Sequence, residues 1–138
     1  MIRRFKWTDL DTVMEIEKEA FPKSPYSRFT FSYYASAYRN NFLVYLVENK
    51  VVAYIIFYSD GHIISIAVKK AYRRRGIGTR LVGEVLKRTG GYAMVEVRAS
   101  NEAAKKFYRH LGFSLYTIIP GYYGDEDALV MTRMPKPD

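Results

Sequence analysis

Residues 62–98 constrain the fold of this 138-residue chain more than any other segment. An apolar run over 62–68 predicts a strand, and apolar residues then recur at helical spacing over 76–88 until a glycine pair at 90–91 ends the pattern. A second strand-like run follows over 92–98. Strand, helix and strand in this order make a βαβ unit, so we expect the two strands to lie parallel in one sheet.

Antiparallel strands and two further helices are predicted around this unit. The runs 42–48 and 51–59 are joined by a turn at Asn49-Lys50 and, with 62–68, make a meander. Two prolines within 21–27 end the first predicted helix. The aromatic segment 29–38 that follows fits a substrate groove, the core or a dimer contact. Further strands are expected at 1–5, 113–119 and 128–134, and helices at 8–20, where Thr8 and Asp11 offer a cap, and at 101–111.

Residue counts exclude several classes of site. The chain has no cysteine, which excludes a disulfide framework, a thiolate zinc site and a cysteine nucleophile. His62 and His110 are its two histidines, so no metal site is expected. The apolar runs are far shorter than the roughly 18 residues that span a bilayer, and residues 1–10 show no secretory pattern. We therefore expect a cytoplasmic protein of one domain with no membrane partner.

Positive charge is concentrated in one part of the chain. The formal net charge is +8, and residues 69–88 hold eight basic residues against one acidic residue, Glu84. A polyanion site this short fits a ligand with a few phosphates better than a long nucleic-acid duplex, and a solvated basic helix face is the alternative. No specific nucleic acid is predicted as a partner.

The loop at the centre of this basic segment has the features of a phosphate site. The sequence Arg-Arg-Arg-Gly-Ile-Gly-Thr at 73–79 lies between a predicted strand and a predicted helix. The first turn of a helix offers unpaired N–H groups, glycines let a phosphate approach closely, and arginines add charge-assisted hydrogen bonds. An ordinary tight turn is the alternative, because neither a Walker loop nor the longer dinucleotide fingerprint is present.

The pattern Arg-x-x-Gly-x-Gly at Arg73–Gly78, preceded by the strand at 63–68, resembles the acetyl-coenzyme A (acetyl-CoA) pyrophosphate loop of the GNAT superfamily of N-acetyltransferases. Glu96–Asn101, Phe107–Phe113 and Tyr122–Met131 resemble signature stretches of the protein N-terminal acetyltransferases, above all the ribosomal-protein alanine acetyltransferase branch and its archaeal relatives. The resemblance implies one N-acetyltransferase domain over 1–138. Its α/β fold would be a mixed, mostly antiparallel sheet with a splayed central parallel strand pair and flanking helices.

The resemblance also implies where acetyl-CoA would bind. The pyrophosphate would lie on the backbone of the loop, and the pantetheine arm would pair with the preceding strand, whose side chains would still be core residues. Asn101 would contact the cofactor, with a helix cap as the alternative. The implied cofactor-binding residues are Ile66, Ala67, Val68, Arg73, Arg74, Arg75, Gly76, Ile77, Gly78, Thr79, Asn101 and Tyr108.

Transfer of an acetyl group from a thioester to an amine needs a base for the amine and benefits from an acid for the leaving thiolate. By resemblance, Glu96 is the base, directly or through water, and Tyr108 is the acid. A carboxylate within the apolar run 92–97 is unexpected in a central parallel strand, and an ion pair with Arg98 is the alternative explanation. The alternative for Tyr108 is a core tyrosine with a satisfied hydroxyl.

Two loops would form the groove for the acceptor amine. By resemblance, Phe21, Pro22 and Tyr26 face Tyr122 and Tyr123, and a narrow groove favours the N-terminal α-amine of a protein or peptide. A small-molecule amine is the first alternative, and a basic RNA-binding or regulatory module without catalysis is the second. The positive charge leaves a ribosome association open, and we expect a monomer or weak dimer.

Overall fold

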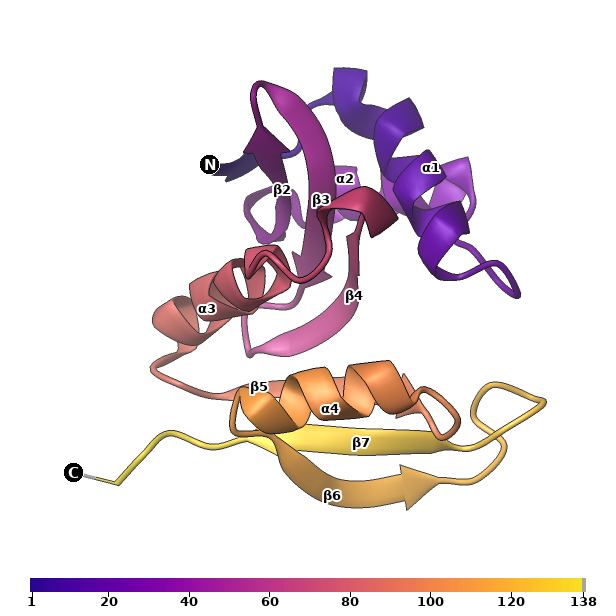
Figure 1. Cartoon of the computed structure of the whole chain (residues 1–138), viewed down its shortest axis with the longest axis vertical. Helices are drawn as coiled ribbons and strands as arrows, with labels where there is room; N and C mark the ends of the chain where they lie inside the picture. The colour runs from indigo at the N-terminus through magenta and orange to yellow at the C-terminus, as the bar shows by residue number, and fades with distance from the viewer. Residues whose placement is uncertain (138) are drawn as a thin grey trace.

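In the computed structural model, which describes residues 1–137, seven strands form one mixed sheet in the order β1-β2-β3-β4-β5-β7-β6 (Figure 1). The strands are β1 (Ile2–Arg4), β2 (Phe42–Val47), β3 (Lys50–Phe57), β4 (His62–Val68), β5 (Ala93–Arg98), β6 (Ser114–Ile119) and β7 (Ala128–Arg133). The α-helices are α1 (Leu10–Ala20), α2 (Arg28–Ala37), α3 (Ile77–Thr89) and α4 (Glu102–His110), with 3-10 turns η1 (Trp7–Asp9), η2 (Arg39–Asn41) and η3 (Lys70–Tyr72).

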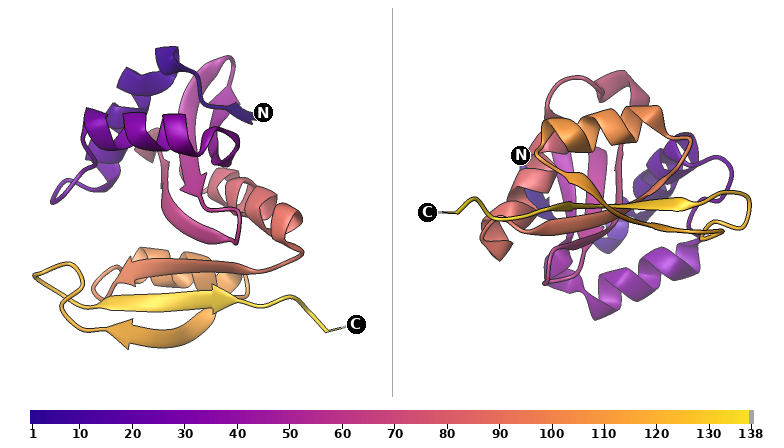
Figure 2. Two further views of the ribbon diagram at one scale, coloured as in Figure 1. Left: turned by 180° about the vertical axis from the view of Figure 1, so that it is seen from behind. Right: turned by 90° about the horizontal axis from the view of Figure 1, so that it is seen from below.

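Strands β2 and β3 lie at the centre of the core because both of their faces are covered. Leu43 and Ile55 belong to the apolar cluster beneath α3, whereas Val44 and Ile56 belong to the cluster beneath α1 and α2. This explains why the two strands read as continuous apolar runs rather than as alternating ones. The predicted meander β2-β3-β4 is confirmed, and Figure 2 shows helices on both sides of these strands.

The parallel pair β4 and β5, expected from the βαβ pattern, opens after a short ladder. Only His62–Met94 and Ile63–Val95 are paired between these strands. Beyond them the strands separate, as Figure 1 shows, while β4 stays paired with β3 as far as Val68. The splay that the family resemblance implies is therefore present, and it leaves one edge of β4 without a strand partner from Ile64 onward.

Two local predictions are wrong. The first helix is preceded by the turn η1, and its entry is set by Asp9, which accepts hydrogen bonds from the Lys6 amide at 2.8 Å and the Arg3 guanidinium at 2.8 and 3.0 Å, rather than by Thr8 and Asp11. The β2–β3 turn is centred one residue early, on Glu48 and Asn49, which both have positive φ. In each case a polar residue beside the predicted one meets the geometry of the turn better.

The aromatic segment forms helix α2, capped by the Ser27 hydroxyl, which accepts from the Thr30 amide. Phe31 is part of the core, and Phe29 and Tyr33 are exposed. The segment therefore supplies core on one face and open aromatic surface on the other. Among the described residues, no helix is long and apolar enough to cross a membrane.

Candidate active site

The predicted phosphate loop lies at the N-terminus of α3 with its backbone amides unpaired by the helix. The first intrahelical bond runs from the Arg80 amide to the Gly76 carbonyl, so the amides of residues 77–79 precede the regular ladder. Gly76 has a φ of 78° and Arg74 a φ of 64°, both in the left-handed region that glycine adopts most easily. This turn directs the N–H groups outward, in the arrangement that binds phosphate at helix N-termini.

The arginines of the loop have different environments. Arg73 donates from Nε to the Val68 carbonyl at 3.0 Å, and the Arg75 guanidinium lies over the Tyr72 ring at 5.0 Å. Both side chains stay exposed. The loop is therefore held against the end of β4 while its positive charge remains available to an anion.

Gly78 lies close to a second helix. A Cβ at this position would lie 3.1 Å from the ring of Phe107 on α4 and 3.8 Å from a methyl group of Val68. Because 3.1 Å is tighter than ordinary contact, the Phe107 ring would have to move by a few tenths of an ångström to admit a side chain at residue 78. The glycine thus brings the phosphate loop, the end of β4 and α4 together.

The open edge of β4 carries the backbone groups expected to pair with pantetheine. Lys69 donates its amide to the Val52 carbonyl of β3 at 2.8 Å. Since successive residues of a strand turn their polar groups to opposite edges, Ile66 and Val68 direct theirs away from β3, toward the splay. The Val68 carbonyl there accepts from Arg73, so the groups offered to a ligand are the Ile66 amide and carbonyl and the Val68 amide. Ala67 is buried, and the side chains of Ile66 and Val68 pack on the core, as expected. The side chains of β4 therefore serve the core, while its backbone is open to a ligand.

Glu96 is paired with His62, so the alternative prediction of an ion pair between Glu96 and Arg98 is wrong. The His62 Nε2 lies 2.6 Å and 2.9 Å from the two carboxylate oxygens of Glu96, and both side chains are mostly buried. Arg98 instead donates to Asp125 at 2.8 Å and to Glu126 at 3.2 Å. The parallel register places His62 beside Met94, so Glu96, two residues further on, lies on the same face of the sheet.

Hydrogen bonding to Glu96 raises the pKa of His62, and burial opposes this only in part. The pair is an acid–base couple at the point where β4 and β5 begin to separate. The sequence does not identify His62 as a site residue, because its signal is slight: a histidine at the start of a strand in a βαβ unit. Its partner lies 34 residues away.

The ring of Tyr108 is buried on α4, with ring centroids 5.0 Å from Phe107 and 5.1 Å from Phe113. Burial raises the pKa of its hydroxyl far above the ordinary value. Within residues 1–137 every fully buried side-chain polar atom has a hydrogen-bond partner, and this hydroxyl has none, so it reaches the molecular surface. The Tyr108 ring is part of the core, as the alternative interpretation predicts, but its hydroxyl has no hydrogen-bond partner there.

The two groove loops meet beside Glu96. Burial raises the pKa of the Tyr26 hydroxyl to about 12, with smaller contributions from the charges of Glu17, Tyr122 and Glu96. Burial and the adjacent Glu96 carboxylate also raise the pKa of Tyr122. Tyr122 packs edge-on against Tyr123, 4.9 Å between ring centroids. Tyrosines from both loops are thus near enough to Glu96 for its charge to raise their pKa values.

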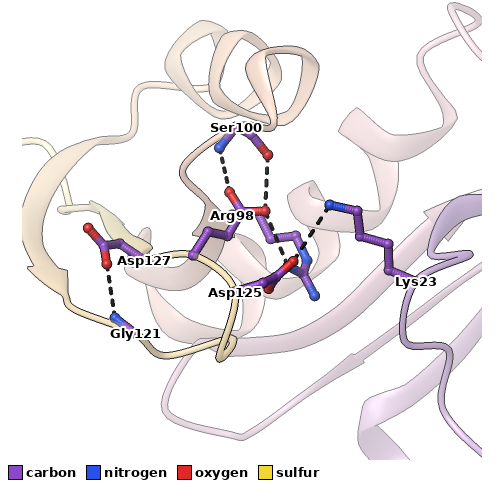
Figure 3. A network of polar contacts seen from close by, with 7 residues as sticks. Lys23, Arg98, Ser100, Gly121, Asp125 and Asp127 are labelled. Atoms are coloured by element: carbon purple, nitrogen blue, oxygen red, sulfur yellow. Dashed lines mark hydrogen bonds and ion pairs between the residues drawn. The ribbon is translucent and has the colours of Figure 1, made fainter.

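An ion-pair network connects the same two loops (Figure 3). Lys23, between α1 and α2, lies 3.6 Å from Asp125, between β6 and β7, and Arg98 of β5 binds Asp125 and Glu126. Glu126 also accepts from the Ser100 amide at 2.9 Å. The Arg98 guanidinium lies 4.3 Å from the centre of the Tyr123 ring. The β6–β7 loop is therefore fixed to β5 and touches the α1–α2 loop.

Glu17 is a second functional candidate that sequence reasoning missed. Its carboxylate is 2% exposed and accepts hydrogen bonds from the Tyr54 hydroxyl and, at 2.8 Å, from the Tyr26 amide. Burial raises the pKa of Glu17, and these hydrogen bonds partly offset the rise. On the sequence, Glu17 lies on the α1 stripe beside Ile16 with no sign that it turns inward. Its contacts tie the Tyr26 loop to β3.

The remaining predicted site residues are Asn101, Phe21 and Pro22. The Asn101 side chain accepts from the Ala104 amide at 3.0 Å, so the helix-cap alternative is correct, and its cofactor contact stays a prediction. Phe21 is half-buried against the core beneath α1 and α2. Pro22 is exposed at the start of the α1–α2 loop. The structure adds no contact between Phe21 or Pro22 and Glu96.

The arrangement fits acetyl-CoA. Unpaired helix amides and arginines suit the pyrophosphate, the open edge of β4 suits the amides of pantetheine, and Tyr108 and Glu96 lie along the splay where the thioester would end. No cluster of three potential metal-ligating side chains occurs within residues 1–137.

Comparison with known proteins agrees with this geometry. The model of the acetyltransferase (GNAT) family matches residues 10–113. The chain belongs to the GNAT acetyltransferase family. Enzymes of this family use acetyl-CoA, so the cofactor that the family resemblance implies is confirmed.

Relatives and a solved structure extend the match along the whole chain. An N-alpha-acetyltransferase of Sulfurisphaera tokodaii is 33% identical, over 94% of this chain and 90% of the relative. The ribosomal protein bS18-alanine N-acetyltransferase of Escherichia coli is 35% identical, over 94% of both chains. The crystal structure of Ard1 from Thermoplasma volcanium has a TM-score of 0.87 at 27% identity and covers 99% of this chain and 98% of that chain. The GNAT fold and the predicted family branch are confirmed.

Proposed function

We propose that this GNAT acetyltransferase transfers the acetyl group of acetyl-CoA to the N-terminal α-amine of a protein or peptide. The observation that carries the proposal is the contact between the α1–α2 and β6–β7 loops, where Lys23 lies 3.6 Å from Asp125. The charge of Glu96 raises the pKa of a tyrosine in each loop, Tyr26 and Tyr122. Two loops joined by an ion pair between Lys23 and Asp125 suit a chain end whose reactive nitrogen lies next to its backbone. The names of the relatives from S. tokodaii and E. coli point to the same substrate class.

Glu96 takes the proton that the attacking amine must lose. The α-amine is largely protonated below about pH 8, so it needs deprotonation before its nitrogen can attack the thioester carbonyl. The first proton of the ammonium passes to the Glu96 carboxylate, directly or through one water, and from there to solvent. The C–N bond then forms, the C–S bond breaks, and Glu96 accepts the second proton that nitrogen loses. His62 holds that carboxylate in position through its Nε2 contacts and shares the proton received.

Tyr108 donates a hydrogen bond to the departing sulfur. Since burial keeps its hydroxyl protonated throughout the neutral range, Tyr108 is present as a donor at every working pH. A phenol with so high a pKa stabilises a thiolate by hydrogen bonding better than by complete proton transfer. The leaving thiolate then takes its proton from solvent.

We further infer that residues 1–138 act as one N-acetyltransferase domain in the cytoplasm, with newly made ribosomal or other protein N-termini as substrates. The cofactor is proposed to lie on Ile66, Ala67 and Val68 and on the loop 73–79, and the peptide between Tyr26, Phe21 and Pro22 on one side and Tyr122 and Tyr123 on the other.

The test is acetyl transfer from labelled acetyl-CoA to short peptides with different free N-terminal residues. An N-blocked peptide with one internal lysine and a small-molecule polyamine are run beside them. We expect transfer to free N-termini and, for Glu96→Gln, a loss of kcat of roughly a hundredfold or more at unchanged acetyl-CoA affinity. Glu15→Gln, on the exposed face of α1, is the matched control.

Transfer confined to the polyamine would overturn the proposed substrate class while leaving the acetyltransferase assignment intact. Transfer to the blocked lysine peptide at a similar rate would show that the groove does not select the chain end. Undiminished kcat in Glu96→Gln would exclude this carboxylate as the base.

A further inference from the structure

A basic cavity lies at the edge of the sheet furthest from β6. It has a volume of about 750 Å³ and is formed where β1 and η1 meet the end of α2. Its lining residues are Arg3, Arg4, Phe5, Lys6, Trp7, Ala35, Ser36, Arg39 and Phe42. None of them belongs to the phosphate loop, the His62–Glu96 pair or the groove loops. The cavity is therefore a separate feature, and the lining holds no acidic side chain.

Three cations of this lining are without acidic partners. Arg3 is neutralised by Asp9 in a two-pronged ion pair. By contrast, Arg4, Lys6 and Arg39 form no ion pair with any residue in the range 1–137, and all three are exposed. Like charges gathered around one concavity raise the local concentration of anions. All three line the same cavity, so a ligand with several negative charges would meet them together.

The basic surface continues from the cavity onto α3. Asn40 accepts from the Arg4 guanidinium at 3.0 Å through its side chain and from Arg88 at 2.6 Å through its carbonyl. Arg88 and its neighbour Lys87 end α3. Although Arg88 is paired with Glu84 at 3.3 Å, the cations form a stripe from β1 through η2 to the end of α3.

Trp7 gives the cavity a flat aromatic wall. It is the one tryptophan of the sequence and is 57% exposed, with only an edge contact to Phe5 at 5.8 Å between ring centroids. Phe5 itself stacks on Phe42 at 4.2 Å, which fixes the floor beneath the indole. An exposed indole beside unpaired cations is the combination that binds unstacked bases together with their phosphates.

We propose that this cavity and its basic stripe bind single-stranded nucleic acid, with a base against Trp7 and phosphates on Arg4, Lys6 and Arg39. A duplex would keep its bases stacked and unavailable to the indole. An acidic peptide would satisfy the cations but leave the aromatic wall without a partner. The contact lies apart from the acetyl-transfer site, so it brings the enzyme to RNA-rich surroundings without occupying the groove.

The test uses the intrinsic fluorescence of Trp7 and the anisotropy of a labelled single-stranded RNA dodecamer without self-complementarity. Saturating coenzyme A is present throughout, so that the phosphate loop is occupied. We expect RNA to quench Trp7 and to bind more weakly as salt rises. Arg4→Ala with Arg39→Ala should reduce the slope of log affinity against log salt by about 1.4, because roughly 0.7 is lost for each phosphate contact to a single strand.

Trp7→Ala should weaken RNA binding at least about fivefold through loss of stacking. Lys18→Ala with Lys50→Ala removes two exposed charges outside the cavity and is the matched control, expected to bind nearly as the wild type. Acetyl transfer to a peptide should be unchanged in all these variants. Equal losses in the control pair, unquenched Trp7 at saturating RNA, or tighter binding of polyglutamate or adenosine monophosphate than of RNA would each overturn the proposal.

Discussion

The proton shared between His62 and Glu96 governs when the proposed base can act. At low pH the imidazolium lies against the carboxylate, and the carboxylate's negative charge is then compensated by its neighbour. Hydrogen bonding to Glu96 raises the pKa of His62 above its usual value near 6.5, so this form persists to higher pH than for an isolated histidine. The rate of acetyl transfer should therefore rise as pH increases through the raised pKa of His62.

The titration of His62 can be measured directly because the chain has one other histidine, His110. We expect NMR to show the His62 resonance titrating above pH 6.5 in the wild type and at a lower pH in Glu96→Gln, since the raising hydrogen bond is weakened. His110→Gln assigns the two signals. An unchanged His62 pKa in Glu96→Gln would mean that the short contact does not persist in solution.

The ring of Tyr108 packs in the core, whereas its hydroxyl is the proposed hydrogen-bond donor, so the two roles can be tested separately. Tyr108→Phe keeps the ring contacts with Phe107 and Phe113 and removes a hydroxyl that has no protein partner. We expect kcat to fall roughly a hundredfold while the free energy of unfolding changes by less than about 1 kcal/mol. The control is Tyr45→Phe, in the same core, whose hydroxyl accepts from Arg80 at 2.7 Å. A full kcat in Tyr108→Phe would leave its hydroxyl without a catalytic role.

The elements themselves were largely predictable because their signals are local. Periodicity over 62–98 predicted the βαβ unit, and the loop 73–79 carried its phosphate chemistry in consecutive residues. The pairing of His62 with Glu96 was not predictable, because it depends on the register of a parallel ladder only two pairs long. Glu17 was missed for a similar reason: an α1 position next to the apolar stripe turns inward only because Tyr54 and Tyr26 offer hydrogen bonds there.

Glu17 joins helix α1 to the groove loop, and its replacement should loosen both. Glu17→Gln retains the shape but leaves one buried donor, the Tyr26 amide or the Tyr54 hydroxyl, without a full acceptor. We expect a loss of about 1–3 kcal/mol in the free energy of unfolding, measured by urea denaturation at pH 7. The KM for peptide should rise with little change in the KM for acetyl-CoA. Glu15→Gln on the same helix is the control, and equal behaviour of the two variants would contradict the anchoring role.

Across the whole molecule, the sheet is held together at its centre by two residue pairs. The strands β1 to β4 and the strands β5 to β7 each pair over most of their length, with a local register shift in three ladders, and the β4–β5 ladder connects the two groups only at His62 and Ile63. A ligand seated in the splay would bond to β4 on one side and lie against α4 on the other. Binding of the cofactor should therefore stabilise the molecule as a whole rather than one loop.

Coenzyme A and pantetheine, which lacks the phosphates, distinguish the two parts of this site. At a hundredfold excess over Kd, coenzyme A should add about 2.7 kcal/mol to the free energy of unfolding and raise Tm by roughly 5 to 10 °C. In hydrogen exchange, coenzyme A should protect the amides of Ile66 and Val68 and those of 77–79, whereas pantetheine should protect the first set alone. The β2–β3 ladder is the internal control. Protection of 77–79 by pantetheine, or exchange at Ile66 and Val68 unaffected by either ligand, would contradict pairing of the ligand with the open edge of β4.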